Sequence, residues 1–285
     1  MNKKDLNTKQ VGNLFGVDES TVRRWSLTGK IKCNKSAGGH RKFSFSNIIE
    51  FAKKHDIQID PNFKSKQLDR KKIIKRILNH TLNHEGKSIE TIFIQLYLNG
   101  VPLEDFMDNY IESVLVQLQK KLDEQEISVA EEHIGRKIIS KSLNSFRASI
   151  IDNKNKNDKN VLCLNLENDI PDLPIDMIQI LLENINYNVH NCGSHTSIKN
   201  LKKLLKDNKY EAIFIYMCDR QCCTSTVHDN IKKTNEDLSA ISILAQKYNI
   251  KLFLGGPSFK NIETDTLKHY NLFNKYSDTL AINKY

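Results

Sequence analysis

Strand-like and helix-like segments alternate through the C-terminal half of the chain, and this alternation constrains the fold more than any other feature. Short apolar runs such as VLCLNL (161–166), EAIFIYMC (211–218) and KLFLGG (251–256) are separated by helical patterns such as IDMIQILLENI (175–185). Such alternation predicts an open parallel sheet with right-handed crossovers, whose ligand crevice lies beyond the carboxyl ends of the strands. We therefore expect a flavodoxin-like or Rossmann-like domain over residues 160–285, in which the segment after Gly256 is ambiguous.

The middle of the chain, residues 71–152, shows no strand pattern and several helical apolar stripes. One stripe includes Ile73 and Ile77, a second includes Ile92 and Leu96, and a third runs from Phe106 to Leu122. A last helix is expected from Ser128 to about Ser149, because Ser128 followed by Glu131 is a capping-box pattern. These stripes predict a helical bundle.

The N-terminal module, residues 1–60, has the pattern of two short helices joined by a tight turn. Thr8 is expected to cap the first helix and Gly16 to end it, while Asp18 or Ser20 caps the second helix, which turns Val22 and Trp25 to the core. In such a pair the second helix enters the major groove of DNA with its N-terminal residues leading. Asp60-Pro61 marks the border of an expected linker over residues 61–70.

A Gly-rich tip between two short alternating segments follows the helix pair, in the stretch KSAGGHRKFS (35–44). It predicts a hairpin wing whose glycines let the backbone approach a phosphate chain, followed by a helix that Ser46 caps. For each charge in the stretch, an ordinary solvated loop is the alternative. The predicted DNA contacts of the whole module are Thr8, Ser20, Thr21, Arg23, Arg24, Lys35, Gly38, Gly39, His40, Arg41 and Lys42.

Composition agrees with a polyanion-binding protein. The 285 residues carry a net charge of +9 with a pI of about 9.1, which suits a phosphate backbone, although bias toward lysine makes a chain basic on its own. The chain has no terminal apolar run of the kind that forms a membrane span or a signal peptide, so we expect a cytoplasmic protein. Its six cysteines are too few and too unevenly placed to form a disulfide framework, so we expect reduced thiols. Because GxSxG, P-loop, GxGxxG and HExxH motifs are lacking, we do not expect an enzyme.

The run from Thr8 to Phe51, with STVRRW and GGHRKFSFSNIIEF, resembles the winged helix-turn-helix of MerR-type and excisionase-type DNA-binding proteins. The resemblance implies sequence-specific binding to double-stranded operator DNA, usually as a homodimer on a two-fold site. A higher homo-oligomer is also compatible with the domain order described next.

The two C-terminal modules together resemble a cobalamin-binding unit, with a four-helix cap followed by a flavodoxin-like domain, as in repressors of the CarH and LitR type. EISVAEEHIGRKII (126–139) is similar to the cap helix with its Glu-His pair, and FLGGPSF (253–259) is similar to the Gly-Gly turn near the nucleotide tail. The resemblance implies that cobalamin would be met by Leu122, Glu132, His133, Asp169, Ser194, Gly255 and Gly256.

Three positions depart from this family pattern. Pro171 stands where the family has the His that ligates cobalt, and Pro174 stands where it has Gly. Proline offers no side-chain donor to a metal, and its ring restricts φ. Leu122 also stands where the cap carries Trp. Cobalamin binding without the His, and a cofactor-free site, both stay open from the sequence.

Cysteine and histidine residues follow two of the predicted strands. His190, Cys192 and His195 follow the second strand, and Cys218, Cys222 and Cys223 follow the third. We expect these two strands to be adjacent and both loops to reach one crevice, where thiolates with imidazoles would suit Zn²⁺ or a thiol sensor. Chance cysteines in a loop are the alternative, because the spacing lacks a CxxC pair.

The sequence thus predicts a regulator with an N-terminal winged helix-turn-helix, a central helical bundle and a C-terminal parallel sheet. Its C-terminal modules would control oligomerisation or DNA engagement. The alternatives are a cofactor-free regulator controlled by protein partners, and a metal or thiol sensor.

Overall fold

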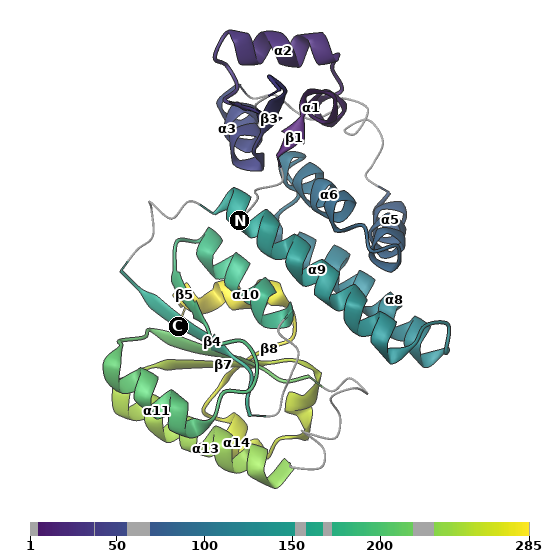
Figure 1. Ribbon diagram of the computed structural model, residues 1–285. Coiled ribbons are helices and arrows are strands. Elements are labelled where there is room, and N and C mark those ends of the chain that lie inside the picture. The colour runs from purple at the N-terminus through teal and green to yellow at the C-terminus, as the bar shows by residue number, and fades with distance from the viewer. Residues whose placement is uncertain are drawn as a thin grey trace.

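A computed structural model gives the fold, and it describes residues 5–36, 38–55, 69–151, 158–167, 173–218 and 231–284. Figure 1 shows three parts in chain order: a small module that contains α1, α2 and α3, a group of helices around α9, and a sheet covered by helices. None of the helices in these ranges is long and apolar enough to cross a membrane.

The first part is a three-helix module with a small antiparallel sheet of order β1-β3-β2. Its elements are β1 (Leu6–Asn7), α1 (Thr8–Phe15), α2 (Glu19–Leu27), β2 (Asn34–Lys35), β3 (Arg41–Phe43) and α3 (Phe45–His55). Phe15, Trp25 and Phe51 pack ring against ring, with centroids 4.8–5.8 Å apart. This aromatic cluster fixes the angle between the helices.

Two predicted helix caps in this module are wrong, while the predicted stop at Gly16 and the start at Asp18 are confirmed. Asn7 caps α1 through a reciprocal capping box with Gln10, so Thr8 is already the first helical residue. The third helix, α3, is capped by Ser44, whose hydroxyl accepts a hydrogen bond from the backbone N–H of Asn47. Ser46 was the expected cap. In both cases the better cap lies one or two residues earlier, because an extended residue must precede the first turn.

The second part is helical, as predicted. It contains α5 (Arg70–Leu82), α6 (Gly86–Leu98), α7 (Leu103–Asp105), the π-helix η1 (Phe106–Ile111), α8 (Glu112–Asp123) and α9 (Val129–Ile150). Ser128 caps α9 with Glu131 in the expected capping box. Helix α5 begins inside the stretch predicted as a linker, while residues 56–68 lie outside the described ranges.

The third part is a five-stranded parallel sheet of order β5-β4-β6-β7-β8, which is the flavodoxin-like order. Helices α11 and α13 cover one face, and α10 with the 3₁₀ helix η4 covers the other (Figure 1). The elements are β4 (Asn160–Leu164), α10 (Leu173–Asn184), β5 (Asn188–Asn191), α11 (Ile198–Asp207), β6 (Ala212–Tyr216), α13 (Ile231–Tyr248), β7 (Lys251–Gly255), η3 (Pro257–Asn261), α14 (Thr264–Leu267), β8 (Asn271–Phe273) and η4 (Tyr276–Lys284).

The strand order corrects one expectation. The second and third strands of this sheet, β5 and β6, are not neighbours, because β4 lies between them. The loops after them therefore leave the sheet on opposite sides of β4. The reason is that the winding reverses after β5: the chain crosses back over β4, and β6 pairs with the other edge of β4.

A polar network fastens α9 to α10 and hence the helical part to the sheet. Arg147 of α9 donates two hydrogen bonds to Glu183 of α10, the Nη2 contact being 2.6 Å long. Two helical turns away, Ser140 donates to Asp176 over 2.8 Å. The Glu183 side chain is fully buried, so the guanidinium raises the cost of separating the two helices.

Gly255 offers a test of the packing at the end of β7. A Cβ there would lie 2.1 Å from the Phe273 ring, so Gly255→Ala is expected to lower the free energy of unfolding by about 1–3 kcal/mol. Gly86→Ala is the control, because its Cβ would meet Ser142 Oγ at 3.4 Å, and its effect should stay within about 0.5 kcal/mol. Chemical denaturation followed by circular dichroism measures both, and equal stability of the two variants would contradict the packing described.

Candidate functional site

Helix α2 presents its polar face to solvent at the end of the molecule farthest from the sheet (Figure 1). Val22 is buried beneath it, whereas Ser20, Arg23 and Arg24 are exposed and Thr21 is half-buried. Arg23 is engaged by Glu19 one turn earlier, with 2.8 Å between Nη2 and Oε1. Arg24 makes no ion pair with any residue in the described ranges, so its guanidinium is available to an external phosphate or base.

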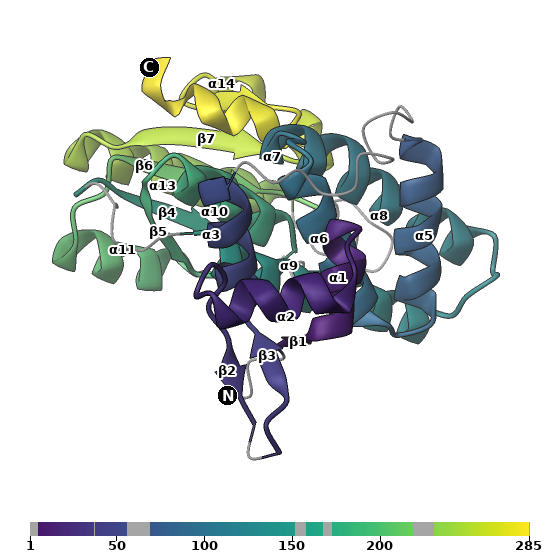
Figure 2. The same cartoon turned by 90° about the horizontal axis from the view of Figure 1, so that it is seen from above.

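The β2–β3 hairpin projects from this module as a wing (Figure 2). Lys35, Gly38, Gly39 and His40 are exposed along it, and Gly39 has φ of 76°, a value suited to glycine. Lys42 is half-buried in β3. The hairpin thus carries its cationic and small residues away from the core.

Arg41 connects the wing to α2. Its Nε donates a 2.6 Å hydrogen bond to Ser26 Oγ, and its side chain is half-buried. This bond sets the orientation of the wing relative to the helix. Thr8, by contrast, is 8% exposed in the first turn of α1, so its hydroxyl has little access to a partner.

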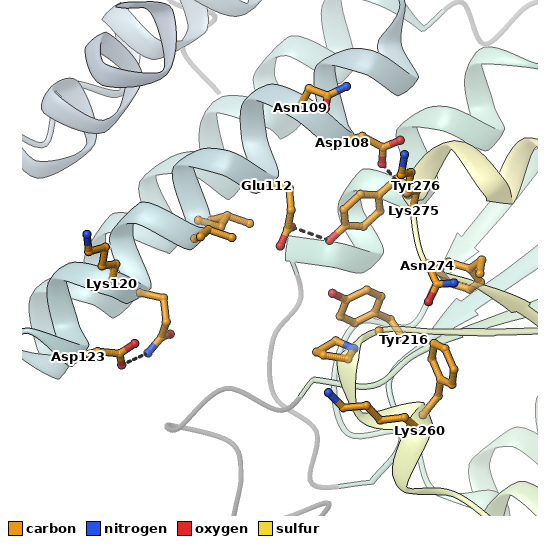
Figure 3. Close-up of a pocket in the computed structure, with 17 residues that line it drawn as sticks. Asp108, Asn109, Glu112, Lys120, Asp123, Tyr216, Lys260, Asn274, Lys275 and Tyr276 are labelled. Atoms are coloured by element: carbon orange, nitrogen blue, oxygen red, sulfur yellow. Dashed lines mark hydrogen bonds between the residues drawn. The ribbon is translucent and has the colours of Figure 1, made fainter. Parts of the chain in front are cut away.

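A second concave region lies at the carboxyl edge of the sheet, where α8 and η1 face the ends of β6, β7 and β8. It is a cleft of about 600 Å³, and Figure 3 shows the side chains that line it. Asp108, Glu112 and Lys120 come from the helical part, and Tyr216, Gly256 and Lys260 come from the sheet part. This is the edge at which ligands bind in parallel open sheets.

Tyr276 is the centre of the contacts in this cleft. Its ring stacks on Tyr216 at 6.0 Å and 7°, and its hydroxyl donates to Glu112 Oε2 over 3.3 Å. Asp108 accepts the backbone N–H groups of Tyr276 and Ser277, at 2.7 and 3.3 Å. Burial raises the pKa of Glu112 and holds the pKa of Tyr276 well above its ordinary value.

The two glycines of the FLGG turn are explained by contacts within the chain. A Cβ on Gly255 would enter the Phe273 ring, and a Cβ on Gly256 would lie 2.2 Å from the Met217 carbonyl oxygen. Gly256 also has φ of 96°. Of the two, Gly256 lines the cleft, while Gly255 is buried behind it.

The residues that the resemblance assigns to the cap helix do not come together at the cleft. The Glu132 side chain is fully buried and ion-paired with Arg136, whereas His133 beside it is exposed. Leu122 is half-buried outside the cleft lining, and Ser194 is half-buried in the loop after β5. Asp169 and Pro171 lie outside the described residues.

The cysteine and histidine candidates are likewise spread out. His190 Nδ1 is 2.8 Å from the Tyr210 hydroxyl, and its ring lies edge-on to that tyrosine. Burial raises the pKa of the Cys163 and Cys192 thiols, which keeps them protonated. Cys218 is buried, His195 is exposed, and Cys222 and Cys223 lie outside the described residues. Among the residues described, no three His, Cys, Asp or Glu side chains converge on a point that could hold a metal.

Comparison with known proteins decides the nature of the first module. A family model described as a helix-turn-helix domain matches residues 6–56. These residues form a helix-turn-helix domain. The match extends past the last residue of α3, so the hairpin and the whole of α3 belong to the matched region. No curated protein matches the chain.

The rest of the chain resembles cobalamin proteins in fold. The monomethylamine corrinoid protein of Methanosarcina barkeri superposes with a TM-score of 0.53 at 14% identity, covering 75% of this chain and 99% of that one. A cobalamin-binding protein of Desulfitobacterium hafniense gives a TM-score of 0.36 at 12% identity, over 74% and 97% of the two chains. The first of these confirms the expected fold, a helical part followed by a flavodoxin-like sheet.

Sequence reasoning missed the residues that dominate the cleft, namely Asp108, Glu112 and Tyr276. Tyr276 lies in the segment that the sequence left ambiguous, and the two acids lie 164 and 168 positions away from it in the chain. The apolar spacing of Tyr276, Leu280 and Ile282 was the available signal, but it is too short to fix a helix.

The buried Glu112 predicts a pH effect on stability. A carboxyl whose pKa is raised by folding binds its proton more tightly in the folded state, so stability falls as pH rises through the interval above the unfolded pKa. Glu112→Gln, which keeps an acceptor for Tyr276, should therefore raise the melting temperature at pH 8 and leave it nearly unchanged at about pH 3.5, below the ordinary pKa of glutamate.

Glu126→Gln is the control for that experiment. Lys121 lowers the pKa of the exposed Glu126, so its substitution should slightly lower the melting temperature at pH 8. Thermal melts of the three proteins at both pH values test this, and a destabilised Glu112→Gln at pH 8 would show that the charged form of Glu112 is favoured by folding.

Proposed function

We propose that the protein is a sequence-specific DNA-binding transcription regulator of the MerR type. The observation that carries the proposal is the outer face of the helix-turn-helix domain: α2 and the wing lie on the side away from the helical part (Figures 1 and 2), and they carry the exposed residues Arg24, Lys35 and His40. Arg24 and the α2 N-terminus would enter the major groove, and Lys35, His40 and Lys42 would meet the backbone or the adjacent minor groove. Residues 1–60 are the proposed DNA-binding domain.

The remaining parts, proposed as domains over residues 71–152 and 160–285, would regulate rather than catalyse. Helix α3 of the DNA-binding module packs on α9, and α9 is bonded to α10 of the sheet. A change at the cleft would therefore reach the module through one helix. An effector can act this way only if it binds the DNA-competent and incompetent arrangements unequally.

The proposed assembly is a cytoplasmic homodimer or higher homo-oligomer, because operators of this class are read by paired modules. A corrinoid is the effector that the fold suggests, and a protein partner is the alternative effector. The contacts of Phe273 and Tyr276 favour the cofactor-free alternative. The thiols among the described residues are spread out, so they do not support a metal or thiol sensor.

Arg24 provides the sharpest test of the DNA-binding face. With a duplex selected by the wild-type protein from a random-sequence pool, Arg24→Ala should weaken binding by about 1–3 kcal/mol, because one base or phosphate contact is lost. If the contact is to phosphate, the slope of log K against log salt should also fall by about one. Fluorescence anisotropy at several salt concentrations measures both, with Lys203→Ala on the distant helix α11 as the control.

Arg41 combines a structural tie with a predicted phosphate contact, and a second variant separates the two. Ser26→Ala removes the hydrogen bond but keeps the guanidinium, so it should weaken binding less than Arg41→Ala. Unchanged affinity in both Arg24→Ala and Arg41→Ala, or failure of the wild-type protein to enrich any duplex, would contradict the proposed function.

A further inference from the structure

We propose that the C-terminal segment Asn271–Lys284 is an internal latch that occupies the bundle-facing edge of the sheet, so that the bundle closes on the sheet without a corrinoid. This inference rests on the proposed function and deepens it, because it states that the regulatory cleft is closed by the chain itself and not by a cofactor. It rests on four contacts of the segment.

The first contact is made by Asp108 in the π-helix η1. Its two carboxylate oxygens accept the backbone N–H groups of Tyr276 and Ser277, the first two residues of η4. These N–H groups have no partner within their own helix, so a carboxylate satisfies them and also meets the positive end of the helix dipole. The bond therefore joins two segments that are far apart in sequence.

The second contact bridges the gap between the helical part and the sheet. Tyr276 lies with one ring face on Tyr216, at the carboxyl end of β6, and its hydroxyl reaches Glu112 on α8. Figure 3 shows the Glu112 and Tyr276 side chains directed toward one another across the cleft. A flat ligand that lay between α8 and the end of β6 would have to displace this aromatic pair.

The third contact is made by Phe273, whose ring fills the space beside the Gly255-Gly256 turn. The Phe273 ring comes within 2.1 Å of where a Gly255 Cβ would lie, so this side chain, not a bound group, occupies the space. Behind it, Phe214 and Phe253 stack at 4.4 Å, and the Phe273 ring lies 6.3 Å from that of Phe214. The three rings form one buried apolar cluster behind the Gly-Gly turn.

The fourth contact anchors the end of the segment. Ile282 is fully buried and η4 packs against α10, so the segment is part of the core on that face of the sheet. Lys251 Nζ also donates to the Ile282 carbonyl oxygen over 3.5 Å. Removing the latch would expose apolar core, which makes a spontaneous exchange of latch for ligand costly.

The Glu132-His133 pair of α9 does not line the described cleft. Glu132 is held by Arg136 inside the bundle, and His133 points to solvent. The residues present therefore do not fit a corrinoid. At the remaining cleft of about 600 Å³, Asp108, Glu112 and Tyr216 are already engaged by Tyr276.

The first experiment tests the consequence for cobalamin. The full-length protein is incubated in the dark with adenosylcobalamin, and separately with hydroxocobalamin, and is then desalted for an absorbance spectrum. We expect no retained corrin absorbance above that of a bovine albumin control. Near-stoichiometric retention of either corrinoid would overturn the proposal.

The second experiment tests the latch itself by hydrogen–deuterium exchange. Asp108→Ala should speed exchange of the Tyr276 and Ser277 amides about ten-fold or more, since charge-assisted hydrogen bonds are lost, while amides of β4 and β6 stay protected. Asp108→Asn, which keeps one acceptor, should give a smaller change and guards against misfolding of the first variant. Asp123→Ala is the matched control, because Asp123 lines the same cleft but accepts only from Gln119 among the described residues.

Equal exchange of these amides in wild-type protein and both Asp108 variants would overturn the latch. The outcome is distinguishable from failure of the proposed function, because neither experiment contains DNA. If the protein binds a selected duplex and also retains corrinoid, only the latch proposal is contradicted. If it retains no corrinoid and enriches no duplex, only the proposed DNA-binding function is contradicted.

Discussion

The packing of α9 is the interaction on which the other parts of the structure depend. Its buried residues Ile139, Leu143 and Phe146 fill the centre of the helical part, and Phe146 packs edge-on against Phe93 and Phe106. The same helix carries Ser140 and Arg147 toward α10, and α3 of the helix-turn-helix domain rests on it. Each of the three parts therefore has a surface complementary to α9.

The helical part and the sheet are joined at two separate places. One is the buried pair of Arg147 and Glu183, and the other is the group of contacts around Tyr276. Two attachments at a distance resist rotation better than one, because a hinge motion that preserves one contact must break the other. Separating the helical part from the sheet would leave the charge of Glu183 buried without the guanidinium of Arg147. A regulatory change that moves these two parts is therefore expected to require a partner that competes for one of the two attachments.

Much of this architecture was accessible from the sequence. Alternation of apolar runs and helical patterns predicted the parallel sheet, and Ser128 with Glu131 predicted the start of α9, because both signals are local. The order of the strands was not local: VLCLNL gives no indication that it lies between its two successors, and the expected adjacency of the second and third strands was wrong for that reason. The Asp108–Tyr276 contact was hidden for the same reason, since it joins residues 168 positions apart.

Resemblance to a family predicted the fold better than the site. The helical part and the sheet superpose on a corrinoid protein at 14% identity. Pro171 and Pro174 depart from the sequence pattern that the resemblance implies for a ligand, and Phe273 and Tyr276 pack against other parts of this chain at the carboxyl edge of the sheet. Burial patterns persist when side chains change within their class, but a ligand site depends on individual atoms. A fold can therefore keep its core while its cleft is rebuilt by a few aromatic residues.

Hydroxyl-radical footprinting of the protein on a duplex that it selects from a random pool tests the central claim most directly. A recognition helix and a wing on one face predict protection of the DNA backbone on one side, flanking a major groove and continuing into the adjacent minor groove. Replacing Lys35, His40 and Lys42 together by alanine should erase only the minor-groove part. Absence of any protected region, or a footprint that the triple variant leaves intact, would contradict the account of how this surface meets DNA.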